Sequence, residues 1–135
     1  MARILLVDDD ADVVRRNTSA LEAAGHIVRT ASTTVRGLEA IHHKVPDLVV
    51  IEALVDGGLT GFDLVRSLAR DFPGLPLIML SRVDEYLTPA ERRAQDRDGG
   101  WLPVQRFLEK PVAPEVLVYE IEHLVAAGVS PGGHA

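Results

Sequence analysis

Short runs of apolar residues recur five times along this chain, and a turn or a helical pattern follows each run. The runs occupy residues 3–7, 26–30, 47–52, 77–80 and 105–109. Apolar runs of this length are typical of strands that are buried on both faces of a parallel sheet. We therefore predict five strands, of which 26–30 has the weakest pattern.

Helical patterns lie between the first three runs. The segment 11–24 repeats apolar residues at helical spacing and ends at Gly25. Ser32 is a candidate N-cap for a second helix that extends to about His43. The residues of that helix expected to face inward are Val35, Leu38 and Ile41.

Three more helix starts follow in the second half of the chain. Thr60 and Asp63 have capping-box spacing, Thr88 precedes a proline at a first helical position, and Pro114 opens the last helix. The apolar stripe after Thr60 consists of Phe62, Val65, Leu68, Ala69 and Phe72. The last helix has Leu117, Ile121 and Leu124 on one face and is expected to end at Gly128.

Strands that alternate with helices predict a doubly wound α/β domain, because each parallel connection needs a crossover helix. The chain has 135 residues, which suits one domain over 1–127 followed by a flexible tail over 128–135. In such sheets the functional crevice lies beyond the carboxyl ends of the strands. Site residues are therefore expected immediately after the strands.

Charge and composition exclude several classes of function. The formal net charge of −6 disfavours binding to nucleic acid, and the absence of cysteine excludes a disulfide framework or a thiol nucleophile. No apolar run is long enough to indicate a signal peptide or a membrane span. We expect a cytoplasmic protein without membrane contact.

Polar residues of a few kinds follow the strong strands. Asp8, Asp9 and Asp10 follow the first strand, Glu52 ends the third, Ser81 follows the fourth and Lys110 follows the fifth. Carboxylates brought together repel one another, so they require a divalent cation, a lysine or a raised pKa. Oxygen ligands of this kind suit Mg²⁺. Asp10 has a simpler interpretation, because it directly precedes a helix that it can cap.

At this point the sequence resembles the receiver domain of bacterial response regulators, over residues 2 to about 127. The matching pieces are ILLVDDD, PDLVVIE, GFDLVRSL, PLIMLS and FLEKPV. The resemblance implies a flavodoxin-like sheet with strand order 2-1-3-4-5. It also implies two-component signalling, in which an aspartate at the position of Glu52 receives a phosphoryl group from a histidine kinase.

The resemblance assigns a role to each strand-end residue. Asp8 and Asp9 correspond to the acidic pair that holds Mg²⁺, together with the residue at position 52 and the carbonyl of Leu54. Ser81 corresponds to the switch hydroxyl, Phe107 to the switch aromatic residue and Lys110 to the phosphate-pairing lysine. The Lys110–Pro111 bond is expected to be cis.

Three features depart from an ordinary receiver. Glu52 replaces the acceptor aspartate and extends its carboxylate by about 1.5 Å towards the cation position. The loop 53–61 lacks the usual proline and is one residue longer than the common form. The segment 82–109 is also long, and within it Trp101 is expected either to anchor the loop or to contact a partner.

We interpret the chain as a stand-alone, atypical receiver that is not phosphorylated at Glu52 and is not an enzyme. It would act by binding a protein, either a histidine kinase or a downstream effector. Formation of a homodimer is a further alternative. One alternative is a conventional receiver that uses Asp56 or an acid among residues 8–10. Another is a Mg²⁺-dependent phosphohydrolase, because residues 8–10 contain Asp-x-Asp. The five histidines lack metal-binding spacing and are interpreted as solvated surface residues.

Overall fold

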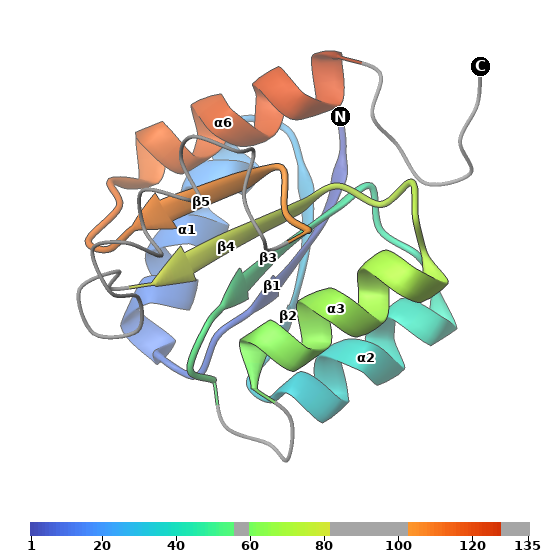
Figure 1. The fold of residues 1–135 in the computed structure, drawn as a ribbon. Coiled ribbons are helices and arrows are strands. Elements are labelled where there is room, and N and C mark those ends of the chain that lie inside the picture. Colours follow the sequence, from blue (N-terminus) through green and yellow to red (C-terminus); the bar gives the residue numbers. More distant parts are fainter. Residues whose placement is uncertain (56–59, 82–102, 128–135) are drawn as a thin grey trace, which may run out of the picture.

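Five parallel strands form the centre of the computed structural model, which describes residues 1–55, 60–81 and 103–127 (Figure 1). The strands are β1 (Arg3–Val7), β2 (Ile27–Ala31), β3 (Leu48–Glu52), β4 (Leu77–Ser81) and β5 (Arg106–Glu109). Their order in the sheet is β2-β1-β3-β4-β5. The predicted α/β fold and its strand order are therefore confirmed, and no predicted strand boundary differs by more than one residue.

Helices cover both faces of the sheet, as Figure 1 shows. The described helices are α1 (Ala11–Ala23), α2 (Thr34–His43), α3 (Gly61–Asp71) and α6 (Pro114–Ala126). The α2 and α3 helices pack on one face, and α1 and α6 pack on the other. The predicted helix start at Thr88, Trp101 and the predicted tail at 128–135 lie outside the described residues.

Two apolar clusters, one on each face of the sheet, form the core. Alternate residues of β3 enter different clusters: Val49 and Ile51 pack towards α2 and α3, and Leu48 and Val50 pack towards α1 and α6. Every residue of β3 and β4 is buried. This two-sided burial explains why both strands are apolar up to their last residue, which is Glu52 in β3 and Ser81 in β4.

The predicted helix ends are mostly confirmed. Asp10 caps α1 by accepting hydrogen bonds from the backbone N–H groups of Asp12 and Val13. Thr60 and Asp63 form the predicted capping box of α3. Gly25, which follows α1, has a φ of 93°, a conformation that glycine adopts without strain. The last helix buries Leu117, Ile121 and Leu124 as predicted.

The inward face of α2 was only partly predicted. Ile41 is buried and Leu38 packs against the core as expected, but Val35 is 46% exposed, and Thr33 rather than Ser32 is the N-cap. Thr34 and Gly37 complete the buried face. A Cβ atom on Gly37 would lie 2.9 Å from a methyl carbon of Val7, so the missing side chain lets this helix approach β1 closely. A helix face that is buried through a threonine and a glycine is not recognised from the spacing of large apolar residues.

The apolar stripe of α3 was only partly correct. Val65 and Leu68 are buried as predicted, but Leu64 is also fully buried and was not part of the stripe. Phe62 and Phe72, at the two ends of the helix, are partly buried.

His26 contradicts the interpretation of all five histidines as solvated. Its side chain is 7% exposed. Its Nδ1 accepts a hydrogen bond from the backbone N–H of Ala2 at 3.1 Å, and its Nε2 lies 2.9 Å from Oε2 of Glu122. Because Nδ1 is an acceptor, a neutral ring must carry its proton on Nε2 and donate to Glu122. The residue therefore joins the beginning of β1 to α6.

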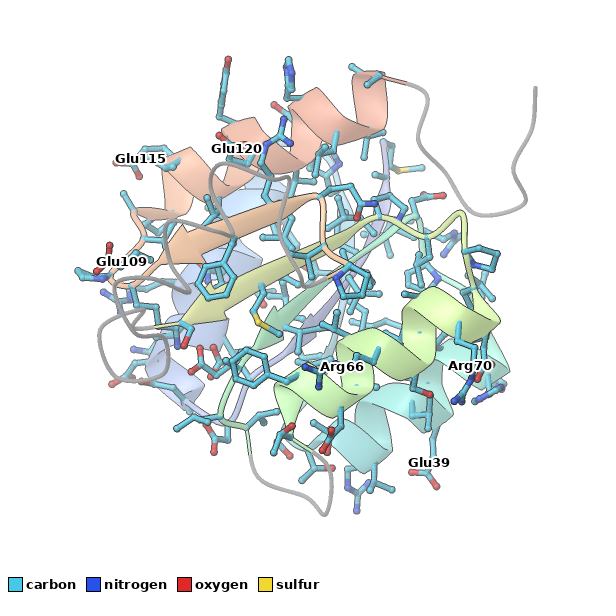
Figure 2. The ribbon with its side chains drawn as sticks, viewed as in Figure 1. Glu39, Arg66, Arg70, Glu109, Glu115 and Glu120 are labelled. Atoms are coloured by element: carbon cyan, nitrogen blue, oxygen red, sulfur yellow. The ribbon has the colours of Figure 1, made fainter. Side chains whose placement is uncertain are left out.

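Charged side chains lie around the periphery of the molecule. Figure 2 shows Glu115 on α6, Glu39 on α2 and Arg70 on α3 pointing away from the sheet. Within the part of the chain that the structure describes, no helix is both long and apolar enough to cross a bilayer.

Gly61 holds the start of α3 close to the end of β3. Its N–H donates to the carbonyl of Ala53 at 2.9 Å. A Cβ atom on Gly61 would collide with the carbonyl oxygen of Glu52 and lie 2.8 Å from the Cα of Ala53. Backbone atoms cannot swing aside as a flexible side chain can, so only glycine fits this contact.

We predict that Gly61→Ala lowers the free energy of unfolding by about 2 kcal/mol, the usual scale for forcing extra volume into a packed site. Urea unfolding followed by circular dichroism measures the change. Gly37→Ala is the matched comparison, because its Cβ meets a side chain and alanine favours the helix. An equal or larger loss for Gly37→Ala would contradict the backbone explanation.

Candidate functional site

Three charged side chains meet at the carboxyl ends of the strands β1, β3 and β5. Asp8 follows β1, Glu52 ends β3 and Lys110 follows β5. The Lys110 Nζ atom lies 3.2 Å from Oδ2 of Asp8 and 2.9 Å from Oε2 of Glu52. The side chains of these three residues are 7%, 11% and 19% exposed, in the order Asp8, Glu52 and Lys110. The predicted gathering of opposite charges at this end of the sheet is present.

Burial raises the pKa of Glu52 above its ordinary value of 4.5. The contact with Lys110 acts in the opposite direction, as does a hydrogen bond from the backbone of Leu54, while the nearby charge of Asp8 raises the pKa further. The loss of hydration outweighs the ion pair. Two largely buried carboxylates therefore share one ammonium group.

Burial opposes the charge of Lys110, but its contacts with Glu52 and Asp8 outweigh that cost and raise its pKa above 10.5. The ammonium group is therefore charged at every ordinary pH. The sequence analysis predicted that clustered carboxylates require a divalent cation, a lysine or a raised pKa. The structure has the charged lysine and a carboxyl group with a raised pKa.

Asp9 and Asp10 take positions different from that of Asp8. Asp8 is buried, and its Oδ1 accepts a hydrogen bond from the backbone N–H of Asp10 at 2.9 Å. Asp9 is exposed and has no hydrogen bond or ion pair with any described residue. The acidic run thus supplies one buried carboxylate, one exposed carboxylate and one helix cap.

The remaining predicted site residues lie on β4, β5 and the loop after β3. The hydroxyl of Ser81 is fully buried and has no hydrogen-bond partner within residues 1–55, 60–81 and 103–127. Phe107 is partly buried against the core cluster on the α2 and α3 face. Leu54 directs a backbone N–H to Glu52 and exposes 47% of its surface. The predicted cis bond between Lys110 and Pro111 is confirmed.

An open cavity of about 400 Å³ lies beside the charged cluster. Its lining includes Glu52 and Lys110, Asn17 on α1, and Val112 and Pro114 after β5. Asn17 was missed by the sequence analysis, which considered only apolar and strand-end residues. Its position four residues after Val13 and four before Leu21 would have placed it on the buried stripe of α1.

The side chains as placed do not fit a magnesium ion. Lys110 bridges the two buried carboxylates, so both already pair with a cationic group of the chain itself. No group of three or more acidic or histidine side chains among the described residues is arranged to hold a metal. Asp9, a predicted ligand, is exposed and apart from this ion pair network.

A comparison with family models matches residues 4–122 of this chain to the response regulator receiver domain. The chain belongs to the receiver domain family of response regulators. Receivers are signalling modules of two-component systems that interact with histidine kinases and effectors, and they commonly bind Mg²⁺ at their acidic pocket. The resemblance found in the sequence is therefore confirmed at the level of family and fold.

Several individual proteins are similar to this receiver. It is 32% identical to the protein PilH of Pseudomonas aeruginosa, over 93% of this chain and 99% of PilH. It is 34% identical to the DNA-binding response regulator MtrA of Mycobacterium tuberculosis, over 88% of this chain and 48% of MtrA. It therefore spans nearly all of PilH but only about half of MtrA. A further relative, NtrX of Azorhizobium caulinodans, is 29% identical to this chain, and the match covers 85% of this chain but only 24% of NtrX.

A solved structure agrees with these matches. The receiver domain of NtrX from Brucella abortus has a TM-score of 0.73 and 29% identity, and the match covers 91% of this chain and 98% of that chain. These comparisons give no support to the phosphohydrolase alternative, since the family model that matches is the response regulator receiver domain. The acceptor alternative at Asp56 lies outside the described residues.

We predict that Lys110→Met lowers the free energy of unfolding at pH 7 by about 3 kcal/mol, because it leaves two buried carboxylates without a partner. Adding Glu52→Gln to this variant should restore part of the loss by removing one of the two charges. Chemical denaturation measures both. Lys44→Met, at an exposed position, is the control and should change stability by less than about 0.5 kcal/mol.

Stability should also depend on pH through Glu52. Its folded-state pKa is raised, so the folded protein binds more protons than the unfolded chain between pH 4.5 and the raised value. The unfolding free energy of the natural protein, relative to Glu52→Gln, should fall as pH rises through that window and then level off. Urea titrations of both proteins at a series of pH values test this. A relative stability that rises with pH would contradict the raised pKa.

Proposed function

We propose that this receiver is atypical: Glu52 stands at the phospho-acceptor position, and the domain works by binding a partner protein without accepting a phosphoryl group. The position of Glu52 at the end of β3, with Asp8 after β1 and Lys110 after β5, supports this assignment. The observation that carries the proposal is the 2.9 Å contact between Glu52 and Lys110.

The contact matters because of where the extra methylene puts the carboxylate. A glutamate reaches about 1.5 Å further than an aspartate at the same backbone position. Its oxygen then lies against the lysine that a bound phosphate would need. Phosphoryl transfer requires the nucleophile and the incoming group to be in line at close range, and an error of about 1 Å is costly.

Burial also opposes the charge of Glu52 and raises its pKa, although Lys110 lies beside it. Ser81, the proposed switch hydroxyl, has no partner among the described residues, which is consistent with a site that retains its phosphate-contact group. We propose that Phe107 keeps the role of switch aromatic residue, and that the receiver comprises residues 1–127.

Magnesium has a reduced role in this proposal. Because Lys110 bridges Asp8 and Glu52, we propose that the ammonium group supplies the positive charge that a metal supplies in other receivers, and that Mg²⁺ binds weakly here. Asp8, Asp9 and the backbone of Leu54 remain the candidates for any metal contact.

The partner is a protein in this proposal, because receivers interact with kinases and effectors and this chain carries a net charge of −6. The same charge disfavours nucleic acid as a direct target. We propose a signalling role without enzymatic turnover.

We predict that the natural protein gains no phosphoryl group when it is incubated with acetyl phosphate and Mg²⁺, whereas Glu52→Asp does. Intact-mass spectrometry detects the adduct, and peptide mapping places it. Glu52→Gln is the control for labelling at any other acid. A phosphoryl group on the natural protein would refute the proposal, and its mapped position would show whether an acid among residues 8–10, Asp56 or Glu52 is the acceptor.

A further inference from the structure

Asn17 is a buried polar residue for which the fold provides no partner. It is only 6% exposed, because it lies on the inward face of α1 together with Leu21. Its side-chain amide makes no hydrogen bond or ion pair with any residue that the structure describes. The amide atoms do not belong to the described side-chain atoms that are sealed from solvent without a partner, so they are open to the adjoining cavity and can bond a group from outside the chain.

Asn17 lines the open cavity of about 400 Å³ beside the charged cluster. Cavities that bind small groups range from about 300 to 1,000 Å³, and they combine apolar walls with a few placed polar atoms. Here Val13, Val112 and Pro114 supply apolar surface. The cavity is therefore large enough for a side chain or a small molecule, and its lining combines apolar and charged residues.

The charges that line the cavity favour a cation. Four carboxylates, those of Asp8, Asp9, Asp10 and Glu52, face two basic groups, Lys110 and Arg16. Lys110 is already shared between two of the carboxylates. Arg16 is exposed and directs its Nε to the carbonyl of Asp12 at 3.4 Å. The cavity consequently keeps an excess of negative charge after its internal pairs are formed.

We propose that this cavity is the docking site for a basic side chain, arginine or lysine, of the partner protein. The apolar stem of that side chain would lie against Val112 and Pro114, and its charged end would donate to the Asn17 amide oxygen and to Asp9. Long basic side chains bury their methylene groups while they keep the charged end among polar atoms. The inference rests on the proposed function only in that a protein partner exists.

A small probe tests the cavity directly. Propylguanidinium copies the end of an arginine side chain, and propylurea is its uncharged counterpart of the same shape. Each is titrated into the full chain while the side-chain NH₂ resonance of Asn17 is followed by ¹⁵N NMR. Propylguanidinium should shift this resonance to saturation. It should also bind about tenfold more tightly than methylguanidinium, which lacks two buried methylene groups.

Two variants of α1 provide the matched comparison. Asn17→Leu keeps the branching of the side chain and removes the amide, so the affinity for propylguanidinium should fall about tenfold, the scale of a charge-assisted hydrogen bond. Its binding is followed through the backbone resonances of Val112. Thr18→Val alters the neighbouring residue, which does not line the cavity, and should leave the affinity unchanged.

Several results would overturn the inference. Equal binding of propylurea would show that charge is not recognised, and unchanged binding to Asn17→Leu would remove the amide from the site. If neither probe shifts the Asn17 resonance to saturation, the cavity holds water only. None of these results depends on phosphorylation. A protein that accepts phosphate and also binds propylguanidinium would lose the proposed function but keep the docking site.

Discussion

The contact of one ammonium group with two buried carboxylates is the constraint on which the site depends. Lys110 reaches Asp8 and Glu52 only because β1, β3 and β5 end on the same side of one sheet. Either carboxylate, buried alone without a partner, would be strongly unfavourable. The fold and the ion pair network therefore support each other: the sheet places the charges, and the lysine makes their burial tolerable.

Glutamate at position 52 brings a carboxylate of the chain itself to 2.9 Å from Nζ of Lys110. Gly61 restricts the backbone at this position, because it lets the start of α3 pack directly against the backbone of Glu52 and Ala53. A change of one methylene thus acts through a backbone that has little freedom to move away.

The sequence predicted the sheet well because two-sided burial leaves few alternatives to an apolar strand, as in β3 and β4. It also predicted Asp8, Glu52 and Lys110 as neighbours, because parallel strands end together. It failed where small or polar residues are buried. The inward face of α2 depends on Gly37, and His26 is enclosed by contacts with Ala2 and Glu122 that no local pattern encodes.

Asn17 is a similar case. Its helical spacing predicts burial, its polar side chain predicts exposure, and it is buried. A leucine there would fill the stripe of α1 and avoid an unpaired amide, so packing alone does not account for the asparagine. The nearby charges give a consistent reason. One lysine cannot neutralise two carboxylates, and Asp9 adds a third negative charge that has no described partner. The network that stabilises the fold therefore leaves an electrostatic requirement unmet beside an open cavity, and a cation from another molecule is the group that would meet it.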